Sequence, residues 1–282
     1  MSPVETARAH LARAARTLAE AGIPDPARDA RLLLARALDL APDRLTLALG
    51  DPVPPEAAAR LAEFLAARAA RRPVSQILGR RAFWGRDFTV TPDVLDPRPE
   101  TETLIAMALE GPPATRLLDL GTGSGAILVT LLAEWPGARG TGTDTSAPAL
   151  DVAALNAARH GVAARADFRL ADWAEGISGP FDVIVSNPPY IPSGEVPGLA
   201  PEVRDWEPHG ALTAGPSGFE AYHRLAADLD RLLAPSGRAL YEFGAGQGPA
   251  IAAIFAAAGF HRLSFGADLD GRQRVLKVER GQ

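Results

Sequence analysis

The stretch VIVSNPPYIP, residues 183–192, places an amide, two prolines and an aromatic ring directly after an apolar run typical of a buried strand. Proline has no N–H and fixes its own backbone, so Pro188 and Pro189 end any sheet ladder and keep the chain rigid. The side-chain oxygen of Asn187 and the backbone carbonyl of Pro188 are then two fixed acceptors, and Tyr190 offers a ring that can stack on a planar group. The motif therefore predicts a site for a planar group that carries N–H hydrogens.

A planar amide or amino nitrogen is a poor nucleophile because its lone pair is delocalised. It can accept a methyl group from a sulfonium if acceptors hold its hydrogens and aim the lone pair. Such positioning contributes about 7–11 kcal/mol in well-oriented systems, so no strong base is needed before transfer and the product loses its proton afterwards. We assign catalysis to Asn187, Pro188 and Tyr190, and substrate binding to these residues and Pro189. The alternative is that NPPY is only a structural turn.

The segment LLDLGTGSGA, residues 117–126, predicts a glycine-rich turn between a strand and a helix. Gly121, Gly123 and Gly125 let the backbone turn tightly and approach a ligand closely, and Ser124 could cap the following helix. The GxGxG spacing differs from the GxGxxG of dinucleotide sites, so the turn alone does not choose between cofactors or exclude a packing role. We assign the glycine turn to a cofactor site, namely Gly121, Thr122, Gly123, Ser124 and Gly125.

The next two strands end in residues that suit an adenosine. Asp144 could accept hydrogen bonds from ribose hydroxyls, although it could also cap the next helix. Asp172 could accept from an adenine amino group and Trp173 could cover the ring, unless Trp173 only packs at the edge of the core. Because ligands of open α/β sheets bind at the carboxyl ends of the strands, these residues predict an adenosine-bearing cofactor there. Asn187, after the fourth strand, belongs to the same site.

Short apolar runs alternate with helical stretches from about residue 114 onward, which favours an α/β domain with a mostly parallel sheet covered on both faces. The last two runs are close in sequence, so we expect them to form an antiparallel hairpin at the end of the sheet. The expected strands span residues 116–120, 140–144, 166–170, 181–186, 238–243, 261–265 and 274–279.

The N-terminal part has the apolar spacing of helices. Helix starts are indicated by SPVE at residues 2–5 and by Asp25 followed by Pro26, because a capping side chain followed by proline is typical of a first turn. The runs AFW and DFTVT further on predict a β-hairpin. We therefore expect a helical bundle over residues 1–72, a linker with the hairpin over 73–98 and the α/β domain over 99–282.

Composition excludes several classes of protein. The 282-residue chain has no cysteine and five histidines without ligand spacing, so we expect neither disulfides nor a metal site. No apolar run approaches the roughly 18–20 residues of a membrane span, and the N-terminus lacks an apolar signal core, so we expect a cytoplasmic protein without membrane contact. Net charge is −5, yet residues 60–86 hold seven arginines and one acid. That run is either a solvated helix face or a basic surface for an acidic or nucleic-acid-bearing partner.

The motifs LDLGTGSGAI, TD.S, DW and SNPPYI, in this order and spacing, resemble those of class I S-adenosylmethionine-dependent methyltransferases. Within that class the chain is most similar to the PrmC/HemK release factor glutamine methyltransferases. The resemblance covers nearly the whole chain, including DARLLLARAL, PVSQILGRRAFWGRDFTV, PRPETE and Glu207-Pro208. It implies a Rossmann-like, seven-stranded, mostly parallel sheet with helices on both faces, plus a small N-terminal helical bundle joined by a β-hairpin linker.

The same resemblance implies S-adenosyl-L-methionine as methyl donor and the glutamine of the Gly-Gly-Gln motif of peptide-chain release factors as acceptor. It implies that Asn187 contacts both substrate and cofactor, and that the glycine turn, Asp144 and Trp173 line the cofactor site. Together with the arginine run, it makes the N-terminal bundle a candidate for docking the release factor. The chain departs from the family pattern at Ala82, Asp96 and Thr145.

NPPY itself specifies a planar nitrogen and does not distinguish glutamine from adenine. The nearest alternative is therefore a nucleic-acid adenine methyltransferase, which on duplex DNA would need base flipping and usually a sizeable basic region. The small bundle and acidic net charge oppose it, while the arginine run leaves it open. A nicotinamide oxidoreductase or a binding module without turnover has no particular use for NPPY. We expect a monomer that acts on release factors and does not bind nucleic acid stably.

Overall fold

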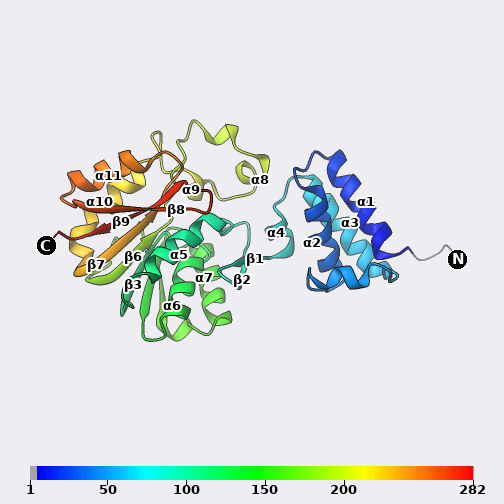
Figure 1. The fold of residues 1–282 in the computed structure, drawn as a ribbon, viewed down its shortest axis with the longest axis horizontal. Coiled ribbons are helices and arrows are strands. Elements are labelled where there is room, and N and C mark those ends of the chain that lie inside the picture. Colours follow the sequence, from blue (N-terminus) through cyan, green and yellow to red (C-terminus); the bar gives the residue numbers. More distant parts are fainter. Residues whose placement is uncertain (1–4, 282) are drawn as a thin grey trace. The chain divides into compact units, whose positions relative to one another are not determined.

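The computed structural model describes residues 5–281 and divides them into two compact units (Figure 1). The first unit comprises the chain up to Gly79 together with Ala200–Trp206, and the second unit comprises Arg80–Leu199 and the chain from Glu207 onward. A short piece of the expected α/β domain thus belongs by its contacts to the helical unit, and so do residues 73–79 of the expected linker. The chain consequently passes between the two units three times.

The first unit is a small helical bundle around a core that includes Leu18, Leu33 and Leu34. Asp25 caps the second helix as predicted, because its side chain accepts from the backbone N–H of Arg28. The predicted helix start at residues 2–5 lies largely outside the described residues. The helices of this unit are α1 (Ala7–Glu20), α2 (Pro26–Ala37), the 3-10 helix η1 (Arg44–Ala48), α3 (Pro55–Ala69), α4 (Val74–Leu78) and α8 (Pro201–Arg204).

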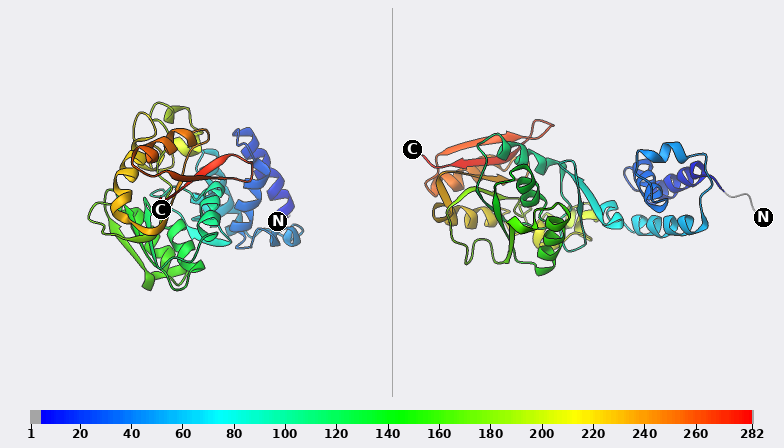
Figure 2. Two further views of the ribbon diagram at one scale, coloured as in Figure 1. Left: turned by 60° about the vertical axis from the view of Figure 1, so that its left-hand side comes forward. Right: turned by 90° about the horizontal axis from the view of Figure 1, so that it is seen from below.

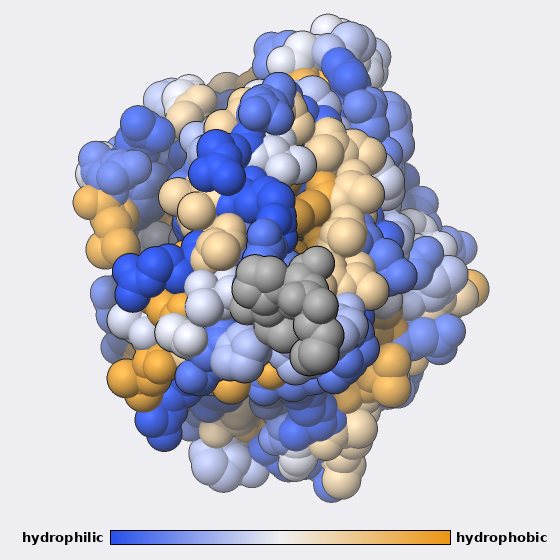
Figure 3. All heavy atoms as spheres, turned by 90° about the vertical axis from the view of Figure 1, so that its right-hand side faces the viewer, coloured by the Kyte–Doolittle hydropathy of each residue, from blue (hydrophilic) through white to orange (hydrophobic). Residues whose placement is uncertain are grey.

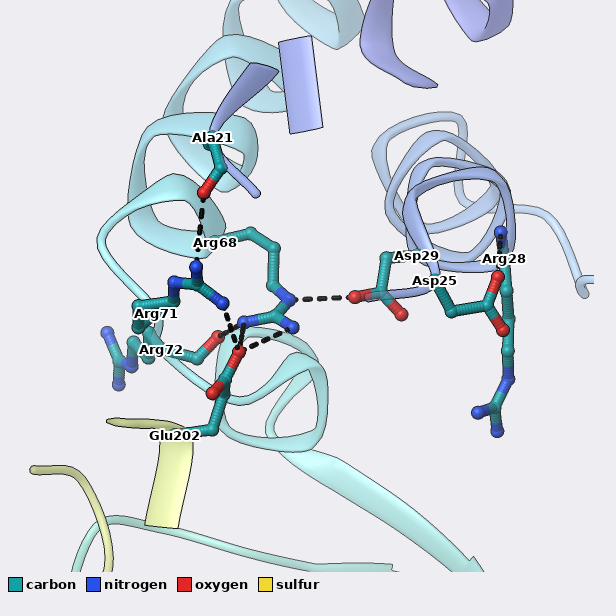
Figure 4. A network of polar contacts seen from close by, with 8 residues as sticks. All are labelled: Ala21, Asp25, Arg28, Asp29, Arg68, Arg71, Arg72 and Glu202. Atoms are coloured by element: carbon teal, nitrogen blue, oxygen red, sulfur yellow. Dashed lines mark hydrogen bonds and ion pairs between the residues drawn. The ribbon is translucent and has the colours of Figure 1, made fainter. Parts of the chain in front are cut away.

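Glu202 joins α8 to the other helices of the first unit (Figure 4). Its Oε1 accepts from both terminal nitrogens of Arg68 at 3.1 Å and from Nη1 of Arg71 at 3.3 Å. Arg68 also donates from Nε to Oδ2 of Asp29 at 2.7 Å, and its side chain is only 7% exposed. A buried guanidinium between two carboxylates is well neutralised, so this network fixes α8 in the first unit.

All seven arginines of residues 60–86 have partners within the described part of the chain. Arg72 lies over the ring of Trp206, 5.7 Å from its centroid. The face drawn in Figure 3 has hydrophobic residues scattered among hydrophilic ones. The arginine run thus serves largely as internal anchors, which neither interpretation of the sequence anticipated. The remaining pairs are Arg60 with Asp39, Arg80 with Asp87, Arg81 with Asp96 and Arg86 with Glu134.

The second unit contains a seven-stranded sheet of order β5-β4-β3-β6-β7-β9-β8 (Figure 1). Only β9 is antiparallel to its neighbours, so the expected final hairpin is confirmed. That hairpin, orange to red in Figure 2, forms one edge of the sheet. The strands are β3 (Arg116–Leu120), β4 (Arg139–Asp144), β5 (Ala166–Leu170), β6 (Phe181–Ser186), β7 (Leu233–Glu242), β8 (Arg262–Ala267) and β9 (Gln273–Glu279).

Helices cover both faces of this sheet, and each face has its own apolar cluster. One cluster includes Leu104 and Leu128, and the other includes Leu225 and Ile251. The chain runs outward from β3 through β4 to β5 and returns to the other side of β3 at β6, so a topological switch point lies there. The helices are α5 (Glu102–Leu109), α6 (Ala126–Glu134), α7 (Ala147–Arg159), α9 (His209–Leu212), α10 (Glu220–Leu232) and α11 (Gly248–Ala257), with the 3-10 helices η2 (Pro99–Thr101), η3 (Ala163–Arg165) and η4 (Val196–Gly198).

The expected β-hairpin is present as β1 (Arg80–Phe83) and β2 (Arg86–Thr89). Its two-residue turn is Trp84-Gly85, and both residues have positive φ, as the tight turn of a twisted hairpin requires. Phe83 and Phe88 are almost fully buried in the same cluster as Leu128, so the hairpin is part of the core of the second unit.

Candidate active site

A cavity of about 460 Å³ lies in the second unit at the carboxyl ends of β3, β4, β5 and β6. This volume lies within the roughly 300–1,000 Å³ typical of small-molecule sites. Residues 93–98 and 208–214 contribute further wall positions. Gly125, Pro188 and Tyr190 of the predicted site do not line the cavity. The predicted residues that do line it are Gly121, Thr122, Gly123, Ser124, Asp144, Asp172, Trp173, Asn187 and Pro189.

The glycine turn requires glycine for two different reasons. Gly121, Gly123 and Gly125 all have left-handed backbones, with φ of 73°, 53° and 76°. A Cβ on Gly123 would meet no atom within 4 Å, so this position leaves open space at the cavity. A Cβ on Gly125 would instead lie 3.0 Å from the Cβ of Ala153 on α7. Gly123 thus leaves room for a ligand, whereas Gly125 permits close packing of two helices.

Ser124 does not cap α6, contrary to the sequence prediction. Gly125 occupies the N-cap position with its left-handed backbone, and no side chain caps the helix there. The backbone carbonyl of Ser124 accepts from Nδ2 of Asn156 at 2.9 Å. The same buried amide accepts from the backbone N–H of Thr89 at 2.7 Å, so it ties β2 to the glycine turn. Asn156 belongs to no recognisable sequence motif, so its role in positioning the glycine turn was not predicted from the sequence.

Asp144 fastens the glycine turn to the start of α7. Its Oδ2 accepts from the backbone N–H of Gly123 and its Oδ1 from that of Ser146, both at 2.9 Å. Ser146 caps α7 by accepting from the N–H of Ala149, so the capping role considered for Asp144 belongs to its neighbour. Each carboxylate oxygen of Asp144 retains a further lone pair at the cavity wall, which a ribose hydroxyl could use.

Asp172 and Trp173 lie at the same edge of the sheet. Asp172 accepts from Nη2 of Arg224 at 2.7 Å, in a pair whose side chains are both about half exposed. Trp173 has a φ of 55°, which a bulky residue adopts only where its surroundings enforce it. Its ring lies 3.7 Å from the Cβ position of Gly121, so the indole covers the glycine turn. Asp172 already has a partner in Arg224, whereas Trp173 lies over the glycine turn. Trp173 is therefore the better candidate for contact with a ligand.

Asn187 enters the cavity wall from the end of β6. Its Nδ2 donates to Oγ1 of Thr101 at 3.2 Å, and Thr101 is almost fully buried. Tyr190 lies behind this wall, where burial, followed by the charge of Glu242, raises its pKa to about 12. The hydroxyl of Tyr190 thus stays protonated at neutral pH. Pro188 is buried, and the structure brings Asn187 and Pro189 to the cavity but neither Pro188 nor Tyr190.

Three buried acids near the site were not assigned from the sequence. Burial raises the pKa of Asp119, Glu207 and Glu242 to about 7 each. Asp119 accepts from Oγ1 of Thr122 at 2.7 Å. A single acid inside an apolar strand, as in RLLDL and LYEF, is costly to bury, and this was the signal available in the sequence. Such acids persist where they hold other groups in place or take part in function.

Within residues 5–281, no cluster of His, Asp or Glu has an arrangement that could hold a metal ion. No helix in that part of the chain is long and apolar enough to cross a membrane.

The fold and the site define a methyltransferase. Residues 99–198 match the family described as methyltransferase small domain. A solved methyltransferase from Pyrococcus furiosus superposes with a TM-score of 0.53 at 18% identity, covering 80% of this chain and 100% of that one. The catalytic domain of hMettl16 reaches 0.58 at 14% identity, covering 76% and 82%. At such identities the likeness is one of fold alone.

Residues 9–79 match the PrmC N-terminal domain. The release factor glutamine methyltransferase of Cereibacter sphaeroides is 58% identical over 261 residues, which cover 93% of this chain and 94% of that protein. The proteins of the same name from Rhodospirillum rubrum and Agrobacterium fabrum are 46% and 42% identical, over 96% and 98% of this chain and 84% and 98% of their own lengths. The chain belongs to the release factor glutamine methyltransferase family.

Proposed function

We propose that the protein methylates the side-chain nitrogen of the glutamine in the Gly-Gly-Gln motif of peptide-chain release factors, with S-adenosyl-L-methionine as donor. The observation that carries this proposal is the place of Asn187, in the wall of the same cavity as the glycine turn. An acceptor for a planar N–H group thus adjoins a nucleotide-type pocket. Family membership selects glutamine over adenine, a choice that NPPY alone does not make.

The residues present fit the proposed cofactor. Gly123 leaves space for a ligand, Asp144 retains acceptor capacity, and Trp173 covers the turn. Apolar positions such as Ala126 and Ile127 complete this wall. When bound, S-adenosyl-L-methionine supplies an electrophilic methyl group on its sulfonium sulfur.

The chain's own contribution to the reaction is orientation. Because Nδ2 of Asn187 donates to Thr101, Oδ1 is the atom of that amide that can accept from a substrate N–H. The carbonyl of Pro188, whose backbone is rigid, would be a second acceptor only if the bound substrate reaches past the cavity wall, because Pro188 does not line the cavity. A substrate amide held in this way presents its nitrogen lone pair in a fixed direction, and positioning then supplies much of the acceleration.

Labelling with methyl-labelled S-adenosyl-L-methionine tests the proposal. We expect label in a full-length release factor and none in its Gly-Gly-Gln variant with alanine for glutamine. Label in that variant, or only in added DNA or RNA, would refute the glutamine assignment and favour the adenine alternative. We also propose that the first unit docks the release factor and that the protein acts as a monomer, which sedimentation of the enzyme alone would check.

A further inference from the structure

Glu242 lies beside Asn187 at the carboxyl edge of the sheet. Strands β6 and β7 are parallel neighbours with Ser186 opposite Tyr241, so the next residues along the two chains are Asn187 and Glu242. Glu242 is only 2% exposed. The hydroxyl of Tyr222 donates to its backbone carbonyl at 2.8 Å, which fixes the end of β7.

The side chains of Asn187, Thr101 and Glu242 form one buried polar cluster. Nδ2 of Asn187 donates to Oγ1 of Thr101 at 3.2 Å, and both side chains lie close enough to the carboxyl group of Glu242 to oppose the rise in its pKa that burial causes. Oε2 of Glu242 has no hydrogen-bond partner among the described residues. Burying a carboxyl group with one oxygen unpartnered lowers the stability of the fold. A role other than stabilisation must therefore explain the glutamate at position 242.

An asparagine amide has two chemically different ends of nearly the same shape. A half-turn about its terminal bond exchanges the oxygen acceptor with the NH₂ donor. Above its raised pKa of about 7, the carboxyl group of Glu242 is ionised and has acceptors only, so it favours the orientation in which NH₂ faces it. The reversed amide would place its oxygen against the carboxylate and lose a charge-assisted hydrogen bond.

Several other groups act on Glu242. Hydrogen bonds from Thr101 and Asn187 oppose the effect of burial on the pKa of Glu242, as does the charge of Arg274, whereas the charge of Glu100 adds to it. The charge of Glu242 in turn raises the pKa of Tyr190 and of Tyr222. Both tyrosines stay protonated at neutral pH, so they add no negative charge beside the carboxyl group.

We propose that Glu242 is a positioning residue that, with Thr101, fixes the amide of Asn187 so that Oδ1 faces the cavity. The proposal rests on the proposed function, in which Oδ1 accepts from the substrate nitrogen. Glu242 does not line the cavity and acts through Asn187. With the amide fixed in this way, Asn187 offers the cavity an acceptor and no donor. The substrate group must therefore carry an N–H that Oδ1 can accept.

The first test measures the environment of the Asn187 side-chain amide by NMR and needs no activity assay. The side-chain NH₂ resonances of Asn187 in the ¹⁵N-labelled full chain can be assigned by their loss in Asn187→Asp. In Glu242→Gln we expect these resonances to shift and their hydrogen exchange to become at least about tenfold faster, because a neutral amide can turn either its oxygen or its NH₂ toward Asn187 and no longer fixes one orientation. Glu279→Gln, the same change on the neighbouring strand β9, should leave them unchanged. Resonances unaltered in Glu242→Gln would overturn the proposal.

The second test exchanges the amide of Asn187 and the carboxyl group of Glu242 by substitution. Glu242→Gln should lower kcat by about tenfold or more with little change in KM, since misorientation affects the reacting geometry. Asn187→Asp alone should also be impaired, because two carboxyl groups then face each other. In the double variant the new amide can donate to the new carboxylate, whose second oxygen faces the cavity, so kcat should exceed that of either single variant.

A double variant whose kcat does not exceed that of both single variants would contradict the proposal. Thermal unfolding and cofactor binding of each variant identify any failure to fold. If the wild-type protein labels no release factor, the proposed function fails while the resonance test still decides the orientation of Asn187. The two proposals are therefore tested separately.

Discussion

Nη2 of Arg98 lies 2.7 Å from Oε1 and 2.6 Å from Oε2 of Glu207, 109 positions away in the sequence. The carboxylate side chain is 1% exposed, and the guanidinium is about one third exposed. The pair joins the segment after the hairpin to the segment after NPPY, and both segments line the cavity. Asp96, a departure from the family pattern, acts on the pKa of Glu207 and contacts Arg81 at 3.6 Å. The departure is thus accommodated by a local ion pair.

Removing one partner of this pair should cost more than removing both. Arg98→Met would leave Glu207 buried without its counter-charge, and we expect a loss of about 3 kcal/mol in the free energy of unfolding. The double variant Arg98→Met/Glu207→Gln should recover most of that loss. Urea denaturation of the three proteins measures the difference. Equal losses in the single and double variants would show that the pair itself carries the stability.

Asp119 makes the stability of the protein depend on pH. Burial raises the pKa of Asp119 from 3.8 to about 7, so between these values the folded state binds a proton more readily than the unfolded state. The free energy of unfolding therefore falls as pH rises through this window and levels off above it. Asp119→Asn cannot ionise, and its stability relative to wild type should increase from about pH 5 to about pH 8. Parallel pH profiles in denaturant titrations would contradict this expectation.

Asn187→Ala should leave the fold intact and remove most of the turnover. The variant loses the proposed substrate acceptor, and loss of one such group typically lowers kcat by about 10²–10³-fold. Steady-state methylation of a release factor measures the effect, and far-UV circular dichroism controls for folding. Turnover near the wild-type level would exclude the role assigned to Asn187.

Two glycines of the turn provide a matched pair. Gly123→Ala places a methyl group in the open space of the cavity, so binding of S-adenosyl-L-methionine should weaken, while stability should fall only by the strain of an alanine in a left-handed backbone. Gly125→Ala directs the same methyl group against Ala153 on α7, so stability should fall more than binding. Calorimetric titration and thermal unfolding distinguish the two effects. The opposite order would mean that the ligand does not approach the turn at Gly123.

Deleting residues 1–72 should reduce methylation of a whole release factor far more than cofactor affinity, because the cavity belongs entirely to the second unit. The deletion also removes Asp29, Arg68 and Arg71 and leaves Glu202 without its partners. Glu202→Gln in the full chain is the control that weakens this anchor alone. If that variant loses as much activity as the deletion, anchoring of α8 rather than docking explains the effect. Equal loss of activity and cofactor affinity in the deletion would mean that the bundle is only structural.

Local patterns predicted the sheet well. Strands β3, β5 and β6 have the expected bounds, since each is a short apolar run between turn residues. Strand β7 begins at Leu233 rather than at residue 238, because a register shift opposite β6 lets the chain pair earlier. The glycine turn and Asn187 were placed at one edge by the rule that ligands bind at the carboxyl ends of strands.

Contacts between distant polar residues could not be predicted in this way. Asn156 meets Thr89 across 67 positions, and Arg68 meets Glu202 across 134. Such pairs leave no periodic pattern, because each residue alone resembles an ordinary polar residue of a helix. The capping role expected of Ser124 failed for a related reason, since a left-handed Gly125 starts the helix and the Ser124 carbonyl bonds to a distant amide.

The three passages of the chain between the units also constrain how this enzyme can be recombined. Exchanging residues 1–79 with those of a relative would separate Arg68 from the Glu202 with which it belongs. A working chimera needs Ala200–Trp206 from the same parent as the helices, so the two pieces must be exchanged together. For the same reason, one proteolytic cut near residue 79 would not release the helical unit intact, because its last piece stays covalently part of the catalytic unit.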